Sequence, residues 1–336
     1  MHIPSPSMSG FHIGPLEIHF YALMYLVGIA LAIWITRRRW RARGGDPDLV
    51  GDVAIWAVPA GIVGGRIYFD ITTPMDIPHE WYGVLAVWSG GLGIWGGIAL
   101  AAVVGAWRVR RSQASVAVFM EAIAPALLVA QAVGRIGNYF NKELFGKPTS
   151  LPWGLEIPLA YRPPGYTQFS RFQPSFLYEL IFDLLLAAAL VWLGHHRRIR
   201  PPGLFALYVA GYSGYRIFEE TIRIDSSAHI LGMRLNFWIA LILCLIGLAW
   251  FAQSQRSTKH SPDEVAGGRP PEPGEVTADA GEPADAPAAA GTAADEAAPD
   301  DPGPDVTAGQ NSGQESTAQV TADEAAAGPA TPRGPD

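Results

Sequence analysis

The stretch FYALMYLVGIALAIWIT, residues 20–36, is followed directly by RRRWRAR, residues 37–43. A predominantly apolar run of about 17–25 residues is long enough to cross a bilayer as a helix. Arg-rich segments next to such a run mark its cytoplasmic end. This one stretch therefore predicts a membrane helix and assigns its C-terminal end to one side of the membrane.

Six further apolar runs of similar length follow in the first 252 residues. A soluble protein with long buried helices is the alternative, but these runs leave no polar face to present to water. The pattern predicts an all-α polytopic membrane protein with seven transmembrane helices. The further spans are 50–69, 84–106, 115–134, 176–194, 203–219 and 235–252.

Basic residues alternate between the loops as the positive-inside rule requires, with exceptions on the predicted outer side at Lys142, Lys147, Arg162, Arg171, Arg223 and Arg234. They follow the first, third, fifth and seventh spans, whereas residues 1–18 and 71–83 contain no Lys or Arg. The sequence thus predicts an outer N-terminus and a cytoplasmic C-terminus. The inner positions are Arg37, Arg38, Arg39, Arg41, Arg43, Arg108, Arg110, Arg111, Arg197, Arg198, Arg200, Arg256 and Lys259.

The composition changes abruptly near residue 252. Residues 1–252 hold 20 of the 24 Lys and Arg but only 15 of the 31 Asp and Glu, and no Phe, Trp, Tyr, Leu or Ile follows Phe251. Such an acidic segment cannot bury enough apolar surface to fold. We expect a membrane domain over 1–252 and an acidic, Ala/Pro/Gly-rich disordered cytoplasmic tail over 253–336, and we expect deletion of 260–336 to leave activity intact.

Three arginines, Arg66, Arg135 and Arg216, lie within or at the ends of apolar spans. Each could extend its charge to the interface, but three on the outer half of the bundle favour a shared site in an interior cavity. Glycine runs at 61–65 and 90–97 predict either close helix packing or backbone exposed to a cavity.

Polar residues concentrate in GRIGNYFNKELFG, residues 134–146, where a cation and amides share a helix face. These groups suit an anionic headgroup, and a capped helix end is an equally good interpretation. In YSGYRIFEETIR, Arg216, Glu220 and Arg223 have the spacing of one helix face. The segment FQPSFLYELIFD, which contains Glu179, is most simply a proline-marked helix start.

Gly211–Gly214 and the segment from Ala228 to Gly232 match the serine and histidine motifs of rhomboid proteases. Ser213 and His229 would form the catalytic dyad of such a protease. His229 lies in a polar stretch rather than in an apolar helix, and only one loop separates the two motifs. A rhomboid-like protease is therefore a weaker alternative.

Together, these blocks resemble the prolipoprotein diacylglyceryl transferase family over residues 1–252. The matching segments are FYALMYL, GGRIYF, WSGGLGIWGG, GRIGNYFNKELFG, QPSFLYE and GYSGYRIFEETIR, in the family's order. The resemblance implies a bacterial, multi-pass cell-membrane enzyme. It would transfer the diacylglyceryl group of phosphatidylglycerol to the lipobox cysteine of a prolipoprotein signal peptide, forming a thioether and releasing glycerol-1-phosphate.

By motif position, the resemblance assigns Arg135 and Arg216 to the phosphate of phosphatidylglycerol. Glu143, Glu220 and Tyr21 are the other expected catalytic residues. The remaining expected lipid-binding residues are Asn138, Gly146, Arg223 and, as a weaker candidate, Arg66. No metal ion, organic cofactor or nucleic-acid partner is implied.

Two departures from the family pattern concern the proton acceptor. Many members have a histidine where this chain has Trp95, and another where it has Gln173. A histidine would be the natural base to form the thiolate. We hypothesise that Glu143, Glu220 or the lipid phosphate takes the proton instead. A lipid or solute transporter is the main alternative function, and it would predict an internal repeat, of which the sequence shows none.

Overall fold

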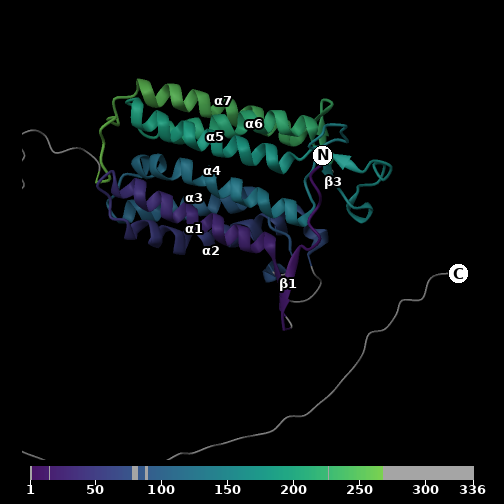
Figure 1. The fold of residues 1–336 in the computed structure, drawn as a ribbon. Helices are drawn as coiled ribbons and strands as arrows, with labels where there is room; N and C mark the ends of the chain where they lie inside the picture. The colour runs from purple at the N-terminus through teal and green to yellow at the C-terminus, as the bar shows by residue number, and fades with distance from the viewer. Residues whose placement is uncertain (1, 15, 78–81, 88–89, 226, 268–336) are drawn as a thin grey trace, which may run out of the picture. The chain divides into compact units, whose positions relative to one another are not determined.

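The computed structural model describes residues 2–14, 16–77, 82–87, 90–225 and 227–267. These described residues form seven α-helices, shown in Figure 1, and short two-stranded sheets. The all-α prediction is confirmed. The helices are α1 (Phe20–Arg41), α2 (Asp48–Thr72), α3 (Ile94–Arg111), α4 (Val116–Asn141), α5 (Ser175–His196), α6 (Gly203–Ile222) and α7 (Leu235–Arg256).

Five of the helices, α1, α2, α4, α5 and α7, are long and apolar enough to cross a membrane by composition alone. The helix α3 ends in three arginines, and α6 contains Arg216, Glu219 and Glu220, so both are more strongly charged. The helix α3 also begins at Ile94, ten residues later than the predicted span. Gly90 and Gly91, shortly before this start, take positive φ values of 86° and 80°, which a right-handed α-helix does not allow.

The helices pack in pairs, α2 along α3, α1 along α4 and α6 along α7, and α4 also packs on α5. Glycine determines how closely α2 approaches α3. A Cβ atom placed on Gly64 would lie 2.4 Å from the carbonyl oxygen of Gly96, and one on Gly96 would lie 2.2 Å from that of Gly64. The predicted close helix packing is therefore confirmed at these two glycines.

Every described hairpin lies at one end of the bundle, which we call the strand end (Figure 1). There α1, α3, α5 and α7 begin, and α2, α4 and α6 end. The paired strands are antiparallel. They are β1 (Gly10–Ile13) with β2 (Leu16–His19), β3 (Leu155–Glu156) with β4 (Arg171–Phe172), and β5 (His229–Ile230) with β6 (Met233–Arg234); 3₁₀ turns lie at Pro74–Asp76, Gly83–Leu85 and Leu159–Tyr161.

The opposite end of the bundle, which we call the basic end, carries the arginine clusters in the last turns of α1 and α3 and just after α5. Arg38 lies over the Trp34 ring, with 5.1 Å from its guanidinium carbon to the ring centroid, and Arg111 lies over the Trp107 ring at 5.8 Å. Aromatic and cationic side chains of this kind concentrate where helices leave a bilayer. Large apolar side chains such as Ile55, Val103 and Leu185 are exposed along the helices between the two ends.

The chain continues past α7 across the basic end as a segment, residues 257–267, that packs on the helix ends (Figure 1). Ala266 donates its N–H to the carbonyl oxygen of Arg43 at 2.9 Å, and the Ser115 hydroxyl donates to Glu264 Oε1 at 2.7 Å. Ala266 is buried with Trp40 in the core of this end. The packed chain therefore extends beyond the expected boundary at 252, and residues 268–336 of the predicted tail lie outside the described residues.

Candidate functional site

The centre of the site is a carboxylate that bridges two arginines from neighbouring helices. Glu179 on α5 is completely buried. Its Oε1 lies 2.6 Å from Nη2 of Arg135 on α4, and its Oε2 lies 3.5 Å from Nη1 of Arg216 on α6. Two arginines that are separate in the sequence are therefore held together by one counterion, as buried charges require.

Tyr212 fixes the position of this carboxylate from α6. Its hydroxyl donates to Glu179 Oε1 at 2.9 Å and accepts a hydrogen bond from Arg135 Nη2 at 3.4 Å. Tyr212 and Arg216 are four residues apart, so both project from the same face of α6. The helices α4, α5 and α6 thus each contribute one charged group to the Glu179 bridge. The Tyr212 hydroxyl on α6 also orients Glu179 and Arg135.

Arg216 has two further partners on its own helix, Glu219 and Glu220, and it makes an ion pair with each. Both glutamates are buried, with 2% and 3% of their surfaces exposed. Glu220 also accepts a hydrogen bond from Arg234 Nε at 2.7 Å. The Arg216 guanidinium is therefore held by carboxylates while one of its edges faces Glu179.

Arg223 departs from its predicted place on the face of α6. The helix ends at Ile222, and Arg223 has extended backbone angles. Its Nε donates to Asp225 at 2.7 Å, and Arg234 Nη2 donates to the same carboxylate at 2.9 Å. Burial alone would raise the pKa of Asp225, but the hydrogen bond and the charge of Arg223, together with the charge of Arg234, lower it below its ordinary value.

The 134–146 motif forms the end of α4 and the turn after it. Asn138 accepts a hydrogen bond from Arg135 Nη1 at 3.1 Å, and it donates through Nδ2 to Glu143 Oε1 at 2.9 Å. Asn141 donates to the same oxygen at 3.2 Å. Lys142 ends the helix in a left-handed conformation, with φ 56°. The predicted helix end with a turn after it is confirmed, and its polar side chains connect to Arg135.

Tyr21 on α1 and Gly146 lie around this cluster. A Cβ atom on Gly137 would lie only 2.8 Å from Cδ2 of Tyr21, so the tyrosine ring packs on the last turns of α4. Its hydroxyl lies 2.8 Å from that of Tyr25. Gly146 donates its N–H to the carbonyl oxygen of Gln173 at 2.9 Å and pairs with the backbone of Arg223. Gly146 therefore joins the turn to the chain that enters α5.

Arg66 is the predicted residue that the structure does not bring to the other two arginines. Its guanidinium donates to the carbonyl oxygens of Gly83, Val84 and Gly90, at 2.5, 2.9 and 2.7 Å, and its Nε lies 3.1 Å from Asp70. Only 4% of its surface is exposed. Arg66 thus holds the connection between α2 and α3 in place.

Glu179 is the main residue that the sequence argument underestimated. Pro174 does precede the first residue of α5, so the predicted helix start is confirmed. The glutamate one turn later is nevertheless the counterion of both arginines. An acidic residue in an apolar span, in a chain with two other spans that carry arginine, was the signal that could have identified it.

The rhomboid-like residues are not brought together. Ser213 is buried on α6, and His229 is exposed in β5. Among the described residues, no hydrogen bond joins the two side chains. Trp95, which replaces a histidine of many relatives, lies in the first turn of α3 and is 39% exposed.

Residues 9–253 match the family model described as prolipoprotein diacylglyceryl transferase. A phosphatidylglycerol–prolipoprotein diacylglyceryl transferase of Frankia alni is 48% identical over 249 residues, which cover 72% of this chain and 65%, slightly under two thirds, of the Frankia protein. A second enzyme of that description, from Streptomyces coelicolor, is 45% identical over 258 residues, covering 74% of this chain and 79% of the relative. A third, from Bifidobacterium adolescentis, is 42% identical over 274 residues, covering 77% and 81%.

The match includes all seven helices up to the last residues of α7. It contains the Arg135, Glu179 and Arg216 cluster and leaves out the acidic segment. The resemblance predicted from the motifs is confirmed, together with the expected class of multi-pass membrane transferase. The chain belongs to the prolipoprotein diacylglyceryl transferase family.

Proposed function

We propose that this chain transfers the diacylglyceryl group of phosphatidylglycerol to the lipobox cysteine of prolipoproteins, and that Arg135 and Arg216 hold the lipid phosphate. The observation that carries the proposal is the pairing of these two guanidiniums by the buried Glu179. Guanidinium groups bind phosphate oxygens with two parallel hydrogen bonds. The family match supplies the reaction, and the cluster supplies two guanidiniums that would bind the phosphate of its anionic substrate.

The expected product is a thioether, which determines the bond that breaks. The cysteine sulfur forms a bond to a carbon of the diacylglyceryl group, so the C–O bond to phosphate must cleave. Its electron pair goes to the phosphate oxygen, and glycerol-1-phosphate leaves with an additional negative charge. Fixed cations in a low-dielectric site stabilise this developing charge, as oxyanion-type sites do. Arg135 and Arg216 would serve this purpose.

Glu143 is the best-placed acceptor for the thiol proton. Its Oε1 receives hydrogen bonds from Asn138 and Asn141, whereas its Oε2 has no partner among the described residues. Glu220, the other glutamate considered, is bound by both Arg216 and Arg234. A carboxylate with one oriented and one available oxygen can accept a proton without breaking an ion pair. We assign the proton to Glu143 Oε2.

We further propose that the strand end faces the outside of the cell and the basic end faces the cytoplasm. The arginine clusters and the Trp34–Arg38 and Trp107–Arg111 pairs at the basic end support this orientation. The cluster around Glu179, which lies one turn into α5, would then be in the outer half of the membrane, the side on which a secreted prolipoprotein presents its cysteine.

The proposal is tested by mass spectrometry of a lipobox peptide incubated with the purified full chain and phosphatidylglycerol. A matched peptide with Cys→Ser is the control. We expect the mass of one diacylglyceryl group on the cysteine peptide alone, with release of an equal amount of glycerol-1-phosphate. Release of glycerol instead of glycerol phosphate, or no addition by a folded protein, would contradict the proposal. Addition to the serine peptide would also contradict it.

A further inference from the structure

Glu219 is a buried carboxyl of the charged cluster that the sequence motifs did not single out. It follows Tyr212 by seven residues and Arg216 by three, so all three side chains project from one face of α6. Only 2% of the Glu219 surface is exposed. A carboxyl in such a place must be paired with a cation or lose its charge by binding a proton.

Two carboxyls meet on one nitrogen of Arg216. Its Nη1 pairs with Oε2 of Glu219 and lies 3.5 Å from Oε2 of Glu179. The side chains of Glu179 and Glu219 are also in hydrogen-bonding contact with each other. Two ionised carboxylates repel each other, and neither has a hydrogen to donate. Carboxyls in contact at a buried site therefore share a proton.

The partners of the two glutamates indicate which one carries this proton. Glu179 Oε1 is bound by Arg135 and by a tyrosine hydroxyl, and both contacts favour the ionised carboxylate. The one ion pair of Glu219 in the described part of the chain is with Arg216, which also pairs with Glu220. Without the proton, Glu179 Oε2 is a buried acceptor that has no donor among the described residues. An O–H on Glu219 supplies the missing donor.

Two cations, Arg135 and Arg216, interact with Glu219 among the residues that the structure describes. The other titratable groups that interact with it are Glu179 and Asp183 on α5 and Tyr215 on α6. The helix α7, which packs along α6, has no charged residue before Arg256 near its C-terminal end. Each of the two arginines is already bound by another carboxylate, so Glu219 has no cation of its own.

The charge of the cluster also favours a proton on Glu219. Three glutamates contact three arginines, namely Glu179, Glu219 and Glu220 with Arg135, Arg216 and Arg234. If all three glutamates were ionised, these six residues would have no net charge to attract a phosphate. A proton on Glu219 leaves one positive charge, which matches the single negative charge of a phosphodiester.

We propose that Glu219 is a proton-carrying positioning residue of the transfer site. Its neutral carboxyl donates to Glu179 Oε2 and accepts a hydrogen bond from Arg216. It thereby orients both groups without cancelling the positive charge that the lipid phosphate requires. This inference rests on the proposed function, because it takes phosphate as the anion that the two arginines hold.

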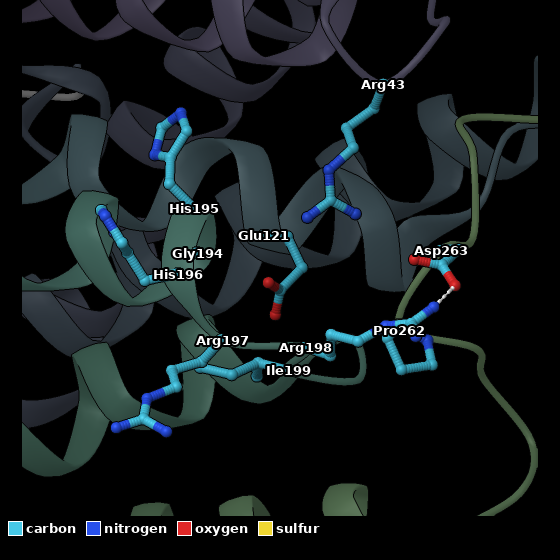
Figure 2. A pocket seen from close by; sticks show the side chains of 10 residues that line it. All are labelled: Arg43, Glu121, Gly194, His195, His196, Arg197, Arg198, Ile199, Pro262 and Asp263. Carbon is cyan, nitrogen blue, oxygen red and sulfur yellow. Dashed lines mark hydrogen bonds and ion pairs between the residues drawn. The ribbon is translucent and has the colours of Figure 1, made fainter.

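The proton is tested by infrared difference spectroscopy of the full chain in phosphatidylcholine vesicles at neutral pH, without substrate. We expect wild type to show the C=O stretching band of a protonated, buried carboxyl, and Glu219→Gln to lose that band. Glu121→Gln is the matched control, because Glu121 is also a buried glutamate but lies at the basic end. Figure 2 shows it in a separate pocket, which Arg43 and His195 also line.

Glu121→Gln should leave the Glu219 band in place. A spectrum of Glu219→Gln that keeps every protonated-carboxyl band of wild type would overturn the proposal. The same holds if Glu121→Gln removes the band that is lost in Glu219→Gln, since the band would then not belong to Glu219.

The transfer rate separates a neutral Glu219 from an ionised one. Glutamine has the shape of a protonated glutamate and keeps an N–H donor for Glu179, so Glu219→Gln should lower kcat/KM by less than about tenfold. Glu219→Leu removes the donor and should lower it by a further factor of about ten. Glu220→Gln removes a charge that Arg216 and Arg234 share, so it should lower kcat/KM by at least about 100-fold.

Two kinetic results would overturn the proposal in folded variants. One is an equal loss of kcat/KM in Glu219→Gln and Glu220→Gln, and the other is an equal rate for Glu219→Gln and Glu219→Leu. The infrared band requires no substrate, so it decides the protonation of Glu219 independently of transfer. If wild type transfers no diacylglyceryl group but Glu219→Gln loses the band, the proposed function fails and the proton on Glu219 stands.

Discussion

Glu179 offers the sharpest test of how the charged cluster works. Replacing it by Gln keeps the shape of the side chain and removes the charge that bridges Arg135 and Arg216. Both ion pairs are largely withdrawn from water, since Glu179 is fully buried and the two arginine side chains are 19% and 17% exposed. Removing one partner of a buried ion pair typically costs about 3–5 kcal/mol.

If the cluster must keep its geometry in the transition state, that cost appears in the rate. Each 1.36 kcal/mol is a factor of ten, so Glu179→Gln should lower kcat/KM by about 10²- to 10⁴-fold. Glu179→Asp should recover part of the lost kcat/KM, because aspartate restores the negative charge although its side chain is one methylene shorter. The readout is the rate of diacylglyceryl addition to a lipobox peptide, measured beside the thermal unfolding midpoint.

Glu156→Gln is the control for the loss of a carboxylate. Glu156 pairs with His2 at 2.8 Å, but its side chain is 50% exposed, and exposed pairs contribute about 0–1 kcal/mol. We expect no more than a few-fold change in rate for this variant. Near wild-type kcat/KM in a folded Glu179→Gln protein would refute the reasoning, since the two arginines would then need no shared counterion.

Three further predictions concern stability. Arg66→Gln should lower the free energy of unfolding by at least about 2 kcal/mol, because it leaves buried carbonyl oxygens of the α2–α3 connection without donors; a stable variant with selectively weaker lipid binding would contradict this. The pKa of Asp225 is lower in the folded protein than in the unfolded chain, where it is near 3.9. The contribution of Asp225 to the free energy of unfolding should therefore be complete above about pH 3.9 and decline as the pH falls below that value. The difference in unfolding midpoint between wild type and Asp225→Asn should therefore shrink below about pH 4, and a constant difference would refute it. Deleting 268–336 should leave the unfolding midpoint unchanged, whereas deleting 260–336 should lower it by removing the contacts of Glu264 and Ala266, with transfer intact in both; equal midpoints would contradict the packing of this segment.

The helices could be predicted from the sequence because hydropathy is a local property. The run at 20–36 lies inside α1, and the apolar pattern located all seven helices. The start of α3 was placed too early because residues 84–93 are as apolar as a helix, whereas Gly90 and Gly91 take positive φ values and Arg66 binds the carbonyl oxygens of Val84 and Gly90. Hydropathy does not report that tertiary contact.

The site was only partly predictable for a similar reason. Arg135 and Asn138 are three residues apart on α4, so their contact follows from helix spacing, and Glu143 is close to them in sequence in the turn after the helix. The link from Arg135 through Glu179 to Arg216 joins three helices, and no single segment shows which acid meets which arginine. Arg66 illustrates the converse, because this arginine in an apolar span was a weaker candidate for lipid binding, and its guanidinium donates to backbone carbonyl oxygens.

The most direct test of the central claim is the transfer rate of Arg135→Gln and Arg216→Gln beside Arg110→Gln. All three lose one positive charge, but only the first two lose it at the proposed phosphate site. We predict that each of the two reduces kcat/KM by about 10²–10³-fold, as removal of one charge-stabilising group does elsewhere. Arg110→Gln should match wild type. Wild-type rates in folded Arg135→Gln and Arg216→Gln proteins would contradict the account.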